Sequence, residues 1–230
     1  GKLANLGVDR ALTTNGSKLA LVAPALAQAG LRRVNVSLDT LKPDRFQEMT
    51  RRDSLPAVLD GIRAARAAGL DPVKVNVVAM AGVNDDELVD FARFGRAEGV
   101  EVRFIEFMPL DADQEWRRAS VLGQAEIVEH IDAVFPLVAE QRGSAPADRF
   151  AFADGGGAPG GGHVGVIASV TQPFCGSCDR VRLTAEGKLR NCLFAVTEVD
   201  LRALMRAGAD DDELAAAVEG CVQAKCRQRR

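Results

Sequence analysis

The sequence predicts an α/β fold with parallel strands, either an open doubly wound sheet or a barrel. Three helical patterns, at residues 17–30, 54–69 and 84–99, place apolar side chains about 3.6 residues apart, after a polar start and before a glycine. Strands that alternate with helices indicate parallel pairing through right-handed crossovers. The β-type runs that frame these helices occupy residues 10–15, 33–39, 73–80 and 102–108.

A polar face on consecutive strands favours the barrel. Asn35, Ser37 and Asp39 alternate with apolar residues, and so do Lys74 and Asn76. Buried parallel strands are usually apolar on both faces, so a polar face that points into a barrel lumen predicts a ligand there. The alternative is an edge strand whose polar side meets solvent. We therefore expect an incomplete TIM-type barrel.

The bulk composition excludes several classes of function. The chain has 230 residues and a net charge of -3, which gives no reason to expect general attraction to nucleic acid or to a membrane. No run approaches the ~20 apolar residues that span a bilayer, and no signal segment opens the chain, so we expect a cytoplasmic protein. Five cysteines, three of them clustered, fit metal binding better than a disulfide framework.

The remaining patterns predict three segments. Residues 1–6 look like the tail of a helix, so the first strands of the barrel are expected to be missing. The glycines of residues 153–165 neither follow a predicted strand nor open a helix, which indicates a flexible linker rather than a phosphate-binding loop. The expected segments are a partial α/β barrel (1–110), a loop, helix and Gly-rich linker (111–165), and a C-terminal region that contains the clustered cysteines and ends in a helix (166–230).

The densest chemistry lies in the stretch "PFCGSCDRVRLTAEGKLRNCL". Cys175 and Cys178 have the spacing that lets two thiolates reach one metal or cluster. The residues that follow are typical of a hairpin, which would return Cys192 to the first pair. Three cysteines leave one ligand position to be filled. Zinc is an open alternative, and so is a chance group of structural cysteines; the candidates for a fourth zinc ligand are His163, Cys221 and Cys226.

Two arginines accompany this cysteine stretch. Arg180 and Arg182 are expected to share a strand face with Cys178. Guanidinium groups beside a metal site suit a bound polyphosphate, whose oxygens match the arginine fork. The alternative is a pair of surface arginines that face water.

Five motifs occur in one order along the chain: "TTNG", "VNVSLDTL", "KVNVV", "RFIEFMP" and "FCxxCxRxRLTxxGxLxxCL". From about Val8 to Leu201 the sequence therefore resembles the GTP 3′,8-cyclase family of radical S-adenosylmethionine (radical SAM) enzymes. The resemblance implies an incomplete barrel of the radical SAM kind with a C-terminal cluster-binding extension. It also implies a lyase that makes (8S)-3′,8-cyclo-7,8-dihydroguanosine 5′-triphosphate from GTP, the first step of molybdopterin biosynthesis.

In that family one 4Fe-4S cluster generates a radical from S-adenosylmethionine, and a second cluster, held by three cysteines, binds the guanine of GTP. The resemblance thus fills the open ligand position with the substrate. Without the resemblance, Ser37 would be interpreted as a strand hydroxyl bonded to backbone, and Met108 as a core thioether. Carried over by position, the 4Fe-4S ligands are Cys175, Cys178 and Cys192, the GTP contacts are Thr13, Lys74, Arg180 and Arg182, and the S-adenosylmethionine contacts are Ser37 and Met108.

The chain departs from the family pattern at both ends. It lacks the C-x-x-x-C-x-x-C motif of the first cluster, the Gly-Gly-Glu-Pro stretch and the terminal Gly-Gly tail. We therefore expect a fragment that is inactive alone, has no certain catalytic residue, and has its second 4Fe-4S cluster only in the full-length protein. The expected partners are an electron donor, the downstream cyclic pyranopterin monophosphate synthase and a second copy in a homodimer. The rival hypothesis is a non-enzymatic zinc- or nucleotide-binding module on a related fold.

Overall fold

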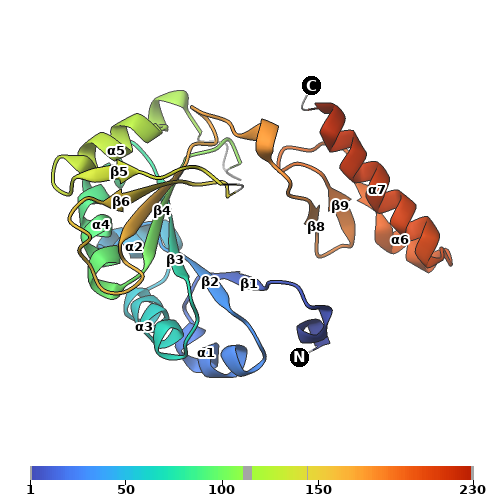
Figure 1. Ribbon diagram of the computed structural model, residues 1–230, viewed down its shortest axis with the longest axis horizontal. Coiled ribbons are helices and arrows are strands. Elements are labelled where there is room, and N and C mark those ends of the chain that lie inside the picture. The colour runs from blue at the N-terminus through green and yellow to red at the C-terminus, as the bar shows by residue number, and fades with distance from the viewer. Residues whose placement is uncertain (1, 111–115, 144, 229–230) are drawn as a thin grey trace. The chain divides into compact units, whose positions relative to one another are not determined.

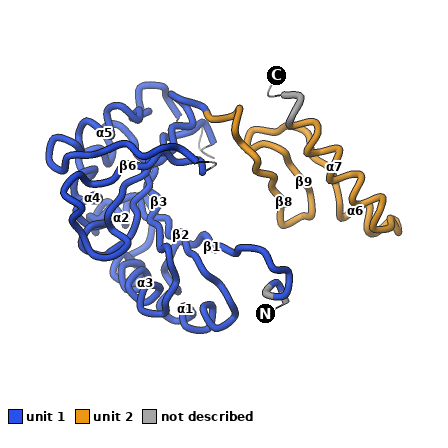
Figure 2. Tube along the Cα trace, in the orientation of Figure 1, with its two compact units in different colours: residues 1–173 blue, residues 174–230 orange. Residues whose placement is uncertain are grey.

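The computed structural model describes residues 2–110, 116–143 and 145–228. The chain forms two compact units, which Figure 2 colours separately: unit 1 is Gly1–Pro173 and unit 2 is Phe174–Arg230. The three-segment division expected from the sequence stays a prediction.

Unit 1 is built on a curved seven-stranded sheet with the order β1-β2-β3-β4-β7-β6-β5 (Figure 1). The first five strands in this order are parallel, and β6 and β5 are antiparallel to their neighbours. This confirms the predicted parallel α/β fold, and the sheet is not closed into a barrel. The strands are β1 (Ala11–Thr14), β2 (Arg33–Ser37), β3 (Val73–Ala79), β4 (Glu101–Glu106), β5 (Leu137–Ala139), β6 (Asp148–Phe152) and β7 (His163–Ile167).

Helices cover the outer face of this sheet (Figure 1). The four main ones are α1 (Leu19–Gln28), α3 (Leu55–Ala67), α4 (Leu88–Glu98) and α5 (Gln124–Asp132). The first three fall inside the helical patterns of the sequence, and α5 lies in the segment 111–165, where one helix was expected. Helix α2 (Pro43–Thr50) was not predicted, because eight residues are too few to show a helical period. The short 3-10 helices of the unit are η1 (Lys2–Leu6), η2 (Asp85–Glu87) and η3 (Arg118–Ser120).

The core lies between the sheet and these helices. The outward-facing strand residues are valines with one phenylalanine, all buried, and they pack on the apolar faces of the helices. Close approach of α3 to the loop before α1 requires glycine, since a Cβ on Gly61 would lie 2.6 Å from the Gly16 carbonyl oxygen. Gly16 itself has a φ of +77°, which favours glycine in this turn. The sheet side of the core consists of Val34, Val36, Val73, Val75, Val77, Val102, Phe104, Val164 and Val166.

The glycine-rich segment is not a linker, so this expectation was wrong. Strand β6 precedes it and β7 begins within it at His163; the two strands pair directly, so the residues between them form the connection of a β-hairpin. It packs on the end of α4, where the Ala158 N–H donates to the Arg96 carbonyl at 2.7 Å. The sequence reading failed here because it did not identify β6. His163 correspondingly starts β7, with its Nε2 3.0 Å from Glu140 Oε1.

Unit 2 contains a three-stranded antiparallel sheet with the order β10-β9-β8. The predicted hairpin is confirmed: β8 pairs with β9, and Gly187 in the turn has a φ of +80°. Across the described residues of both units, no helix combines the length and the apolar character that a membrane crossing needs. The elements of unit 2 are η4 (Cys175–Ser177), β8 (Arg182–Leu183), β9 (Lys188–Arg190), β10 (Val199–Asp200), α6 (Leu201–Arg206) and α7 (Asp211–Gln228).

Candidate functional site

The inner face of the unit 1 sheet is polar, as the sequence predicts. Its side chains form two rows across neighbouring strands, because the register of parallel strands aligns every second residue. Asn35 Nδ2 donates to Thr13 Oγ1 at 3.3 Å within the first row. The first row is Thr13, Asn35, Lys74 and Glu101, and the second is Ser37, Asn76, Arg103 and Gly165.

Glu101 is the centre of a cation cluster on this face. Its side chain is 6% exposed, and its carboxylate accepts from Arg103 Nε at 2.6 Å. Lys74 Nζ lies 3.7 Å from Glu101 Oε1, and Arg149 Nε lies 3.4 Å from Glu101 Oε2. One carboxylate thus faces three cations, from β3, β4 and β6. We call Lys74, Arg103 and Arg149 the cation cluster.

The charges of this cluster perturb one another. Burial lowers the pKa of Lys74; Glu101 opposes that shift, while Arg103 and Arg149 reinforce it. For Glu101, burial pushes the pKa upward, but the surrounding cations outweigh burial and the pKa is lowered. Arg149 also pairs with Glu140, at 3.2 Å from Nη1 to Oε2, so the three cations face two carboxylates. One positive charge remains in excess when all five groups are ionised, which suits an anionic ligand.

The second row has an unused acceptor. Asn76 Oδ1 is buried and has no hydrogen-bond partner in the part of the chain that the structure describes. Its register neighbour Arg103 flanks Gly165, where a Cβ would lie 3.2 Å from Arg103 Cγ. A buried amide oxygen without a donor is costly unless something else occupies the site. This position can accept a hydrogen bond from a ligand hydroxyl or amino group.

The two residues expected to contact S-adenosylmethionine lie at the carboxyl ends of their strands. Ser37 ends β2 with its side chain exposed, and no hydrogen bond of its hydroxyl is found within the described ranges. Met108 follows β4, is half-buried and lies outside the core cluster, so it is not the core thioether of the alternative interpretation. Carboxyl ends of parallel strands are where ligands bind in α/β folds.

Buried acidic side chains hold the loops at this edge of the sheet. Glu106, at the end of β4, is fully buried and accepts from the backbone N–H groups of Val170 and Thr171, both at 2.7 Å, and of Gln124 at 3.1 Å. The Thr171 hydroxyl also donates to it. Glu106 therefore joins β4 to the start of α5 and to the loop after β7.

In unit 2, cations surround the sulfur of Cys178. Arg180 donates to Cys178 Sγ from Nε at 3.3 Å and from Nη2 at 3.1 Å, and Lys225 Nζ lies 3.3 Å away. Burial pushes the pKa of this thiol upward, but hydrogen bonds from Arg180 and Lys225 outweigh burial and lower the pKa to about 7. A thiol with this pKa is largely thiolate just above neutral pH, and thiolate is the form that ligates iron or zinc.

The other two cysteines frame the same loop. Cys175 is exposed at the start of η4, and Cys192 is half-buried two residues after β9. Within the described ranges, no three His, Cys, Asp or Glu side chains gather closely enough for a single metal ion. The three cysteines lie on one loop and its hairpin, and the Cys178 sulfur accepts hydrogen bonds from Arg180 and Lys225. This arrangement fits an iron–sulfur cluster, in which each thiolate binds a separate iron. Of the candidate zinc ligands, Cys221 is buried on α7, while the side chain of Cys226 lies outside the described residues.

The arginines of this loop differ in their surroundings. Arg180 is turned onto Cys178 and stacks over Phe174, with its Cζ 4.8 Å from the ring centroid. Arg182 lies opposite Arg190 in the β8–β9 ladder. Arg190 forms an ion pair with the carboxylate of Glu198. Arg182 has no ion pair among the described residues, so its guanidinium is available to an anion.

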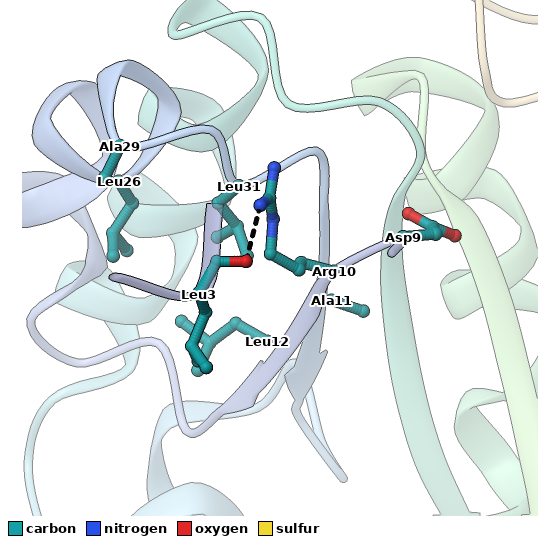
Figure 3. A pocket seen from close by; sticks show the side chains of 8 residues that line it. All are labelled: Leu3, Asp9, Arg10, Ala11, Leu12, Leu26, Ala29 and Leu31. Carbon is teal, nitrogen blue, oxygen red and sulfur yellow. Dashed lines mark hydrogen bonds between the residues drawn. The ribbon is translucent and has the colours of Figure 1, made fainter. Parts of the chain in front are cut away.

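A hollow beside β1 is separate from these residues. It lies at the edge strand near the N-terminal segment, where Arg10 Nη1 donates to the Leu3 carbonyl at 2.9 Å (Figure 3). Mainly apolar side chains line it, and no residue predicted for substrate, cofactor or metal binding is among them. The lining residues are Leu3, Asp9, Arg10, Ala11, Leu12, Leu26, Ala29 and Leu31.

Sequence reasoning missed four side chains near these sites. Arg103 lies inside a predicted strand but was not identified as a binding residue. The strand that contains Glu101 was expected to begin at Val102, so Glu101 was left out, and Arg149 lies on the unpredicted β6. Lys225, on α7, is 8% exposed and belongs to a chain with few lysines, but nothing local in the sequence connects it with Cys178.

Comparison with known proteins gives two family matches. Residues 100–230 match the model for Molybdenum Cofactor Synthesis C, and residues 2–95 match that for the Radical SAM superfamily. Over 89% of its length the chain is 53% identical to the GTP 3',8-cyclase of Streptomyces coelicolor, covering 59% of that protein. It is 50% identical to that of Mycobacterium ulcerans over 93% of the chain and 60% of the relative, and 48% identical to that of Corynebacterium glutamicum over 90% and 56%. The chain thus spans somewhat over half the length of the curated relatives it matches.

Proposed function

The chain belongs to the Molybdenum Cofactor Synthesis C family, and we propose that it is the substrate-binding part of a radical SAM GTP 3′,8-cyclase. The reaction converts GTP to (8S)-3′,8-cyclo-7,8-dihydroguanosine 5′-triphosphate at the start of molybdopterin biosynthesis. The observation that carries the proposal is the cysteine loop of unit 2, in a chain 53% identical to such a cyclase. In this loop two cations contact the Cys178 sulfur, and Arg182 has no ion pair within the described residues.

The cysteine loop would hold a 4Fe-4S cluster. Cys175, Cys178 and Cys192 are the proposed ligands, and the cations around Cys178 keep its sulfur in the form that ligates iron. When bound, a cluster with three cysteine ligands offers one iron whose remaining position can take a substrate atom. Arg182 supplies a guanidinium for the phosphates or ribose of GTP, and Arg180 provides a second one if it turns away from the sulfur.

The polar face of unit 1 offers separate contacts for GTP. Lys74 and Thr13 are the contacts carried over from the family, and the geometry adds Arg103, which shares Glu101 with Lys74. A triphosphate would give these cations the negative charge that a single carboxylate does not supply. Asn76 Oδ1 adds an acceptor on the same face.

Ser37 and Met108 are the proposed contacts for S-adenosylmethionine, at the carboxyl ends of β2 and β4. An electron donor, a downstream cyclic pyranopterin monophosphate synthase, a homodimer and a cytoplasmic location complete the proposal. The second 4Fe-4S cluster is assigned to none of the residues of this chain.

The test is anaerobic reconstitution of the 230-residue chain with iron and sulfide, followed by metal analysis and calorimetric titration with GTP. We expect about four irons and four sulfides per chain, with a broad visible absorbance, and GTP binding that is tighter with the cluster than without it. About one tightly held zinc and no iron would refute the proposal and favour the zinc module instead.

A pair of cysteine variants provides the matched control. Cys192→Ser should lose the cluster, because it removes one of three ligands, whereas Cys221→Ser should keep it. Equal iron content in both variants would contradict the assigned ligand set.

A further inference from the structure

Lys225 on α7 places a buried ammonium group between two segments of the cysteine loop. Its Nζ donates to the Asn191 carbonyl at 2.8 Å and to the Arg180 carbonyl, and it lies 3.3 Å from Cys178 Sγ. The residue is 8% exposed. A buried ammonium is tolerated where its three protons find acceptors, and here each proton has one.

The two carbonyls belong to opposite arms of the hairpin. Arg180 lies two residues after Cys178, and Asn191 directly precedes Cys192. The β8–β9 ladder holds these arms together only from the pair Arg182–Arg190 onward. Continued for two more residues, its register would place residue 180 opposite residue 192. Lys225 therefore bridges the arms at the point where the ladder has ended and the cysteines begin.

We propose that Lys225 is a positioning residue that fixes the distance between the Cys178 arm and the Cys192 arm, and so prepares the three cysteines to hold an iron–sulfur cluster. The inference rests on the proposed function. Partners of this kind, outside the metal ligands themselves, commonly decide how tightly a metal group is held. A second contact from the same helix supports the assignment, since Asn191 Nδ2 donates to the Cys221 carbonyl at 3.4 Å.

The competing interpretation is that Lys225 merely attaches α7 to the hairpin. In that case its removal should weaken the fold of unit 2 as a whole. A positioning role should instead appear in the retention of the cluster, with the helix intact, and should be restored in part by a side chain that keeps N–H donors.

The experiment compares Lys225→Met and Lys225→Arg with the wild-type chain after reconstitution with iron and sulfide. Methionine keeps much of the length and apolar volume of the stem but removes the donors, whereas arginine keeps donors in another geometry. Lys188→Met is the control, because Lys188 lies on β9 of the same hairpin and pairs with Glu198 at 2.9 Å, on the surface. The readouts are the rate of iron release to a chelator and the far-UV circular dichroism unfolding midpoint.

We expect Lys225→Met to release iron about tenfold faster than wild type, with Lys225→Arg in between and Lys188→Met within about twofold of wild type. The unfolding midpoint of each variant should stay within about 5 °C of wild type. Release from Lys225→Met within twofold of wild type would overturn this inference and leave the proposed function intact. Loss of the helical signal in Lys225→Met would also overturn it, because the role would then be structural. A wild-type chain that takes up no iron would refute the proposed function, and the inference with it.

Discussion

Replacement of Glu106 by glutamine tests the connection between β4 and the loop that leads toward the cysteines. In the wild-type chain, Glu106 Oε2 accepts the N–H groups of Val170 and Thr171, and Oε1 accepts the Gln124 N–H and the Thr171 hydroxyl. Glutamine keeps one oxygen. Its best orientation leaves that oxygen on the two N–H groups of the loop and turns its amide nitrogen toward Gln124.

The magnitude follows from these contacts. The Gln124 N–H then faces another donor and is left unsatisfied, which costs about 1–3 kcal/mol in a buried site. The Thr171 hydroxyl can rotate and accept from the amide, so it is not lost. The two remaining backbone hydrogen bonds lose their charge assistance, at about 0.5–1 kcal/mol each. We therefore expect Glu106→Gln to lower the free energy of unfolding by about 3 kcal/mol, and Glu106→Ala by more.

Urea denaturation followed by tryptophan fluorescence measures this loss. Trp116 is the single tryptophan, and its indole N–H donates at 2.9 Å to the carbonyl of Phe107, the neighbour of Glu106. The control is Glu126→Gln, which alters an exposed glutamate that accepts from the Gly123 N–H at 3.0 Å and should cost less than about 1 kcal/mol. Equal losses in the two variants would show that the buried acceptor network does not stabilise the fold.

The other predictions concern charge. Lys74→Met should weaken GTP binding by about one to two decades, as expected for a lost charge-assisted contact, while iron content stays constant and the exposed control Lys42→Met has no effect; calorimetry that finds unchanged affinity would place Lys74 outside the site. Arg180→Ala and Arg182→Ala should each reduce GTP affinity, and the double variant should lose less than the sum, since both act on one anion; additive losses in calorimetric titrations would show independent roles. Asp39 has a raised pKa, because burial outweighs its hydrogen bond from Val78. The native state therefore retains this proton to higher pH than the unfolded chain does, so the stability from Asp39 is full below the unfolded pKa of about 4 and is lost as pH rises through the folded pKa. Asp39→Asn should remove this decline. If denaturant titrations give the same difference in the free energy of unfolding between Asp39→Asn and wild type at every pH, the prediction is wrong.

The sequence predicted the parallel part of the fold because local patterns determine it. The alternation of valines with Asn35 and Lys74 indicated both the strands and their polar face, and the register then aligns these residues. The antiparallel strands β5 and β6 were missed, since they are short and mostly half-buried, with no clear alternation. That omission also led to the wrong prediction of a linker at residues 153–165.

The candidate site was predictable only where a motif marks it. The spacing of Cys175 and Cys178 and the hairpin after them are local, and the structure contains that hairpin. Glu106 lies inside the motif "RFIEFMP", yet its partners are 18 and 64–65 residues away, so its anchoring role could not be read from the sequence. Lys225 is separated from Cys178 by 47 residues, and only the packing of α7 on the hairpin connects them.

The cation cluster on the unit 1 sheet is better explained by binding than by stability. Had Lys74 been placed to stabilise the fold through Glu101, its pKa would be raised. Instead the pKa is lowered, because burial and the neighbouring arginines together outweigh the carboxylate. A lysine with a lowered pKa is less favourably charged in the folded chain than in the unfolded one, so its charge at neutral pH opposes folding. An anion placed against Lys74 and Arg103 would make the charge of Lys74 favourable to the folded state, since added negative charge favours the protonated lysine. Such an arrangement is typical of a binding site held ready for its ligand, and this supports the assignment of Lys74 to a phosphate-bearing substrate.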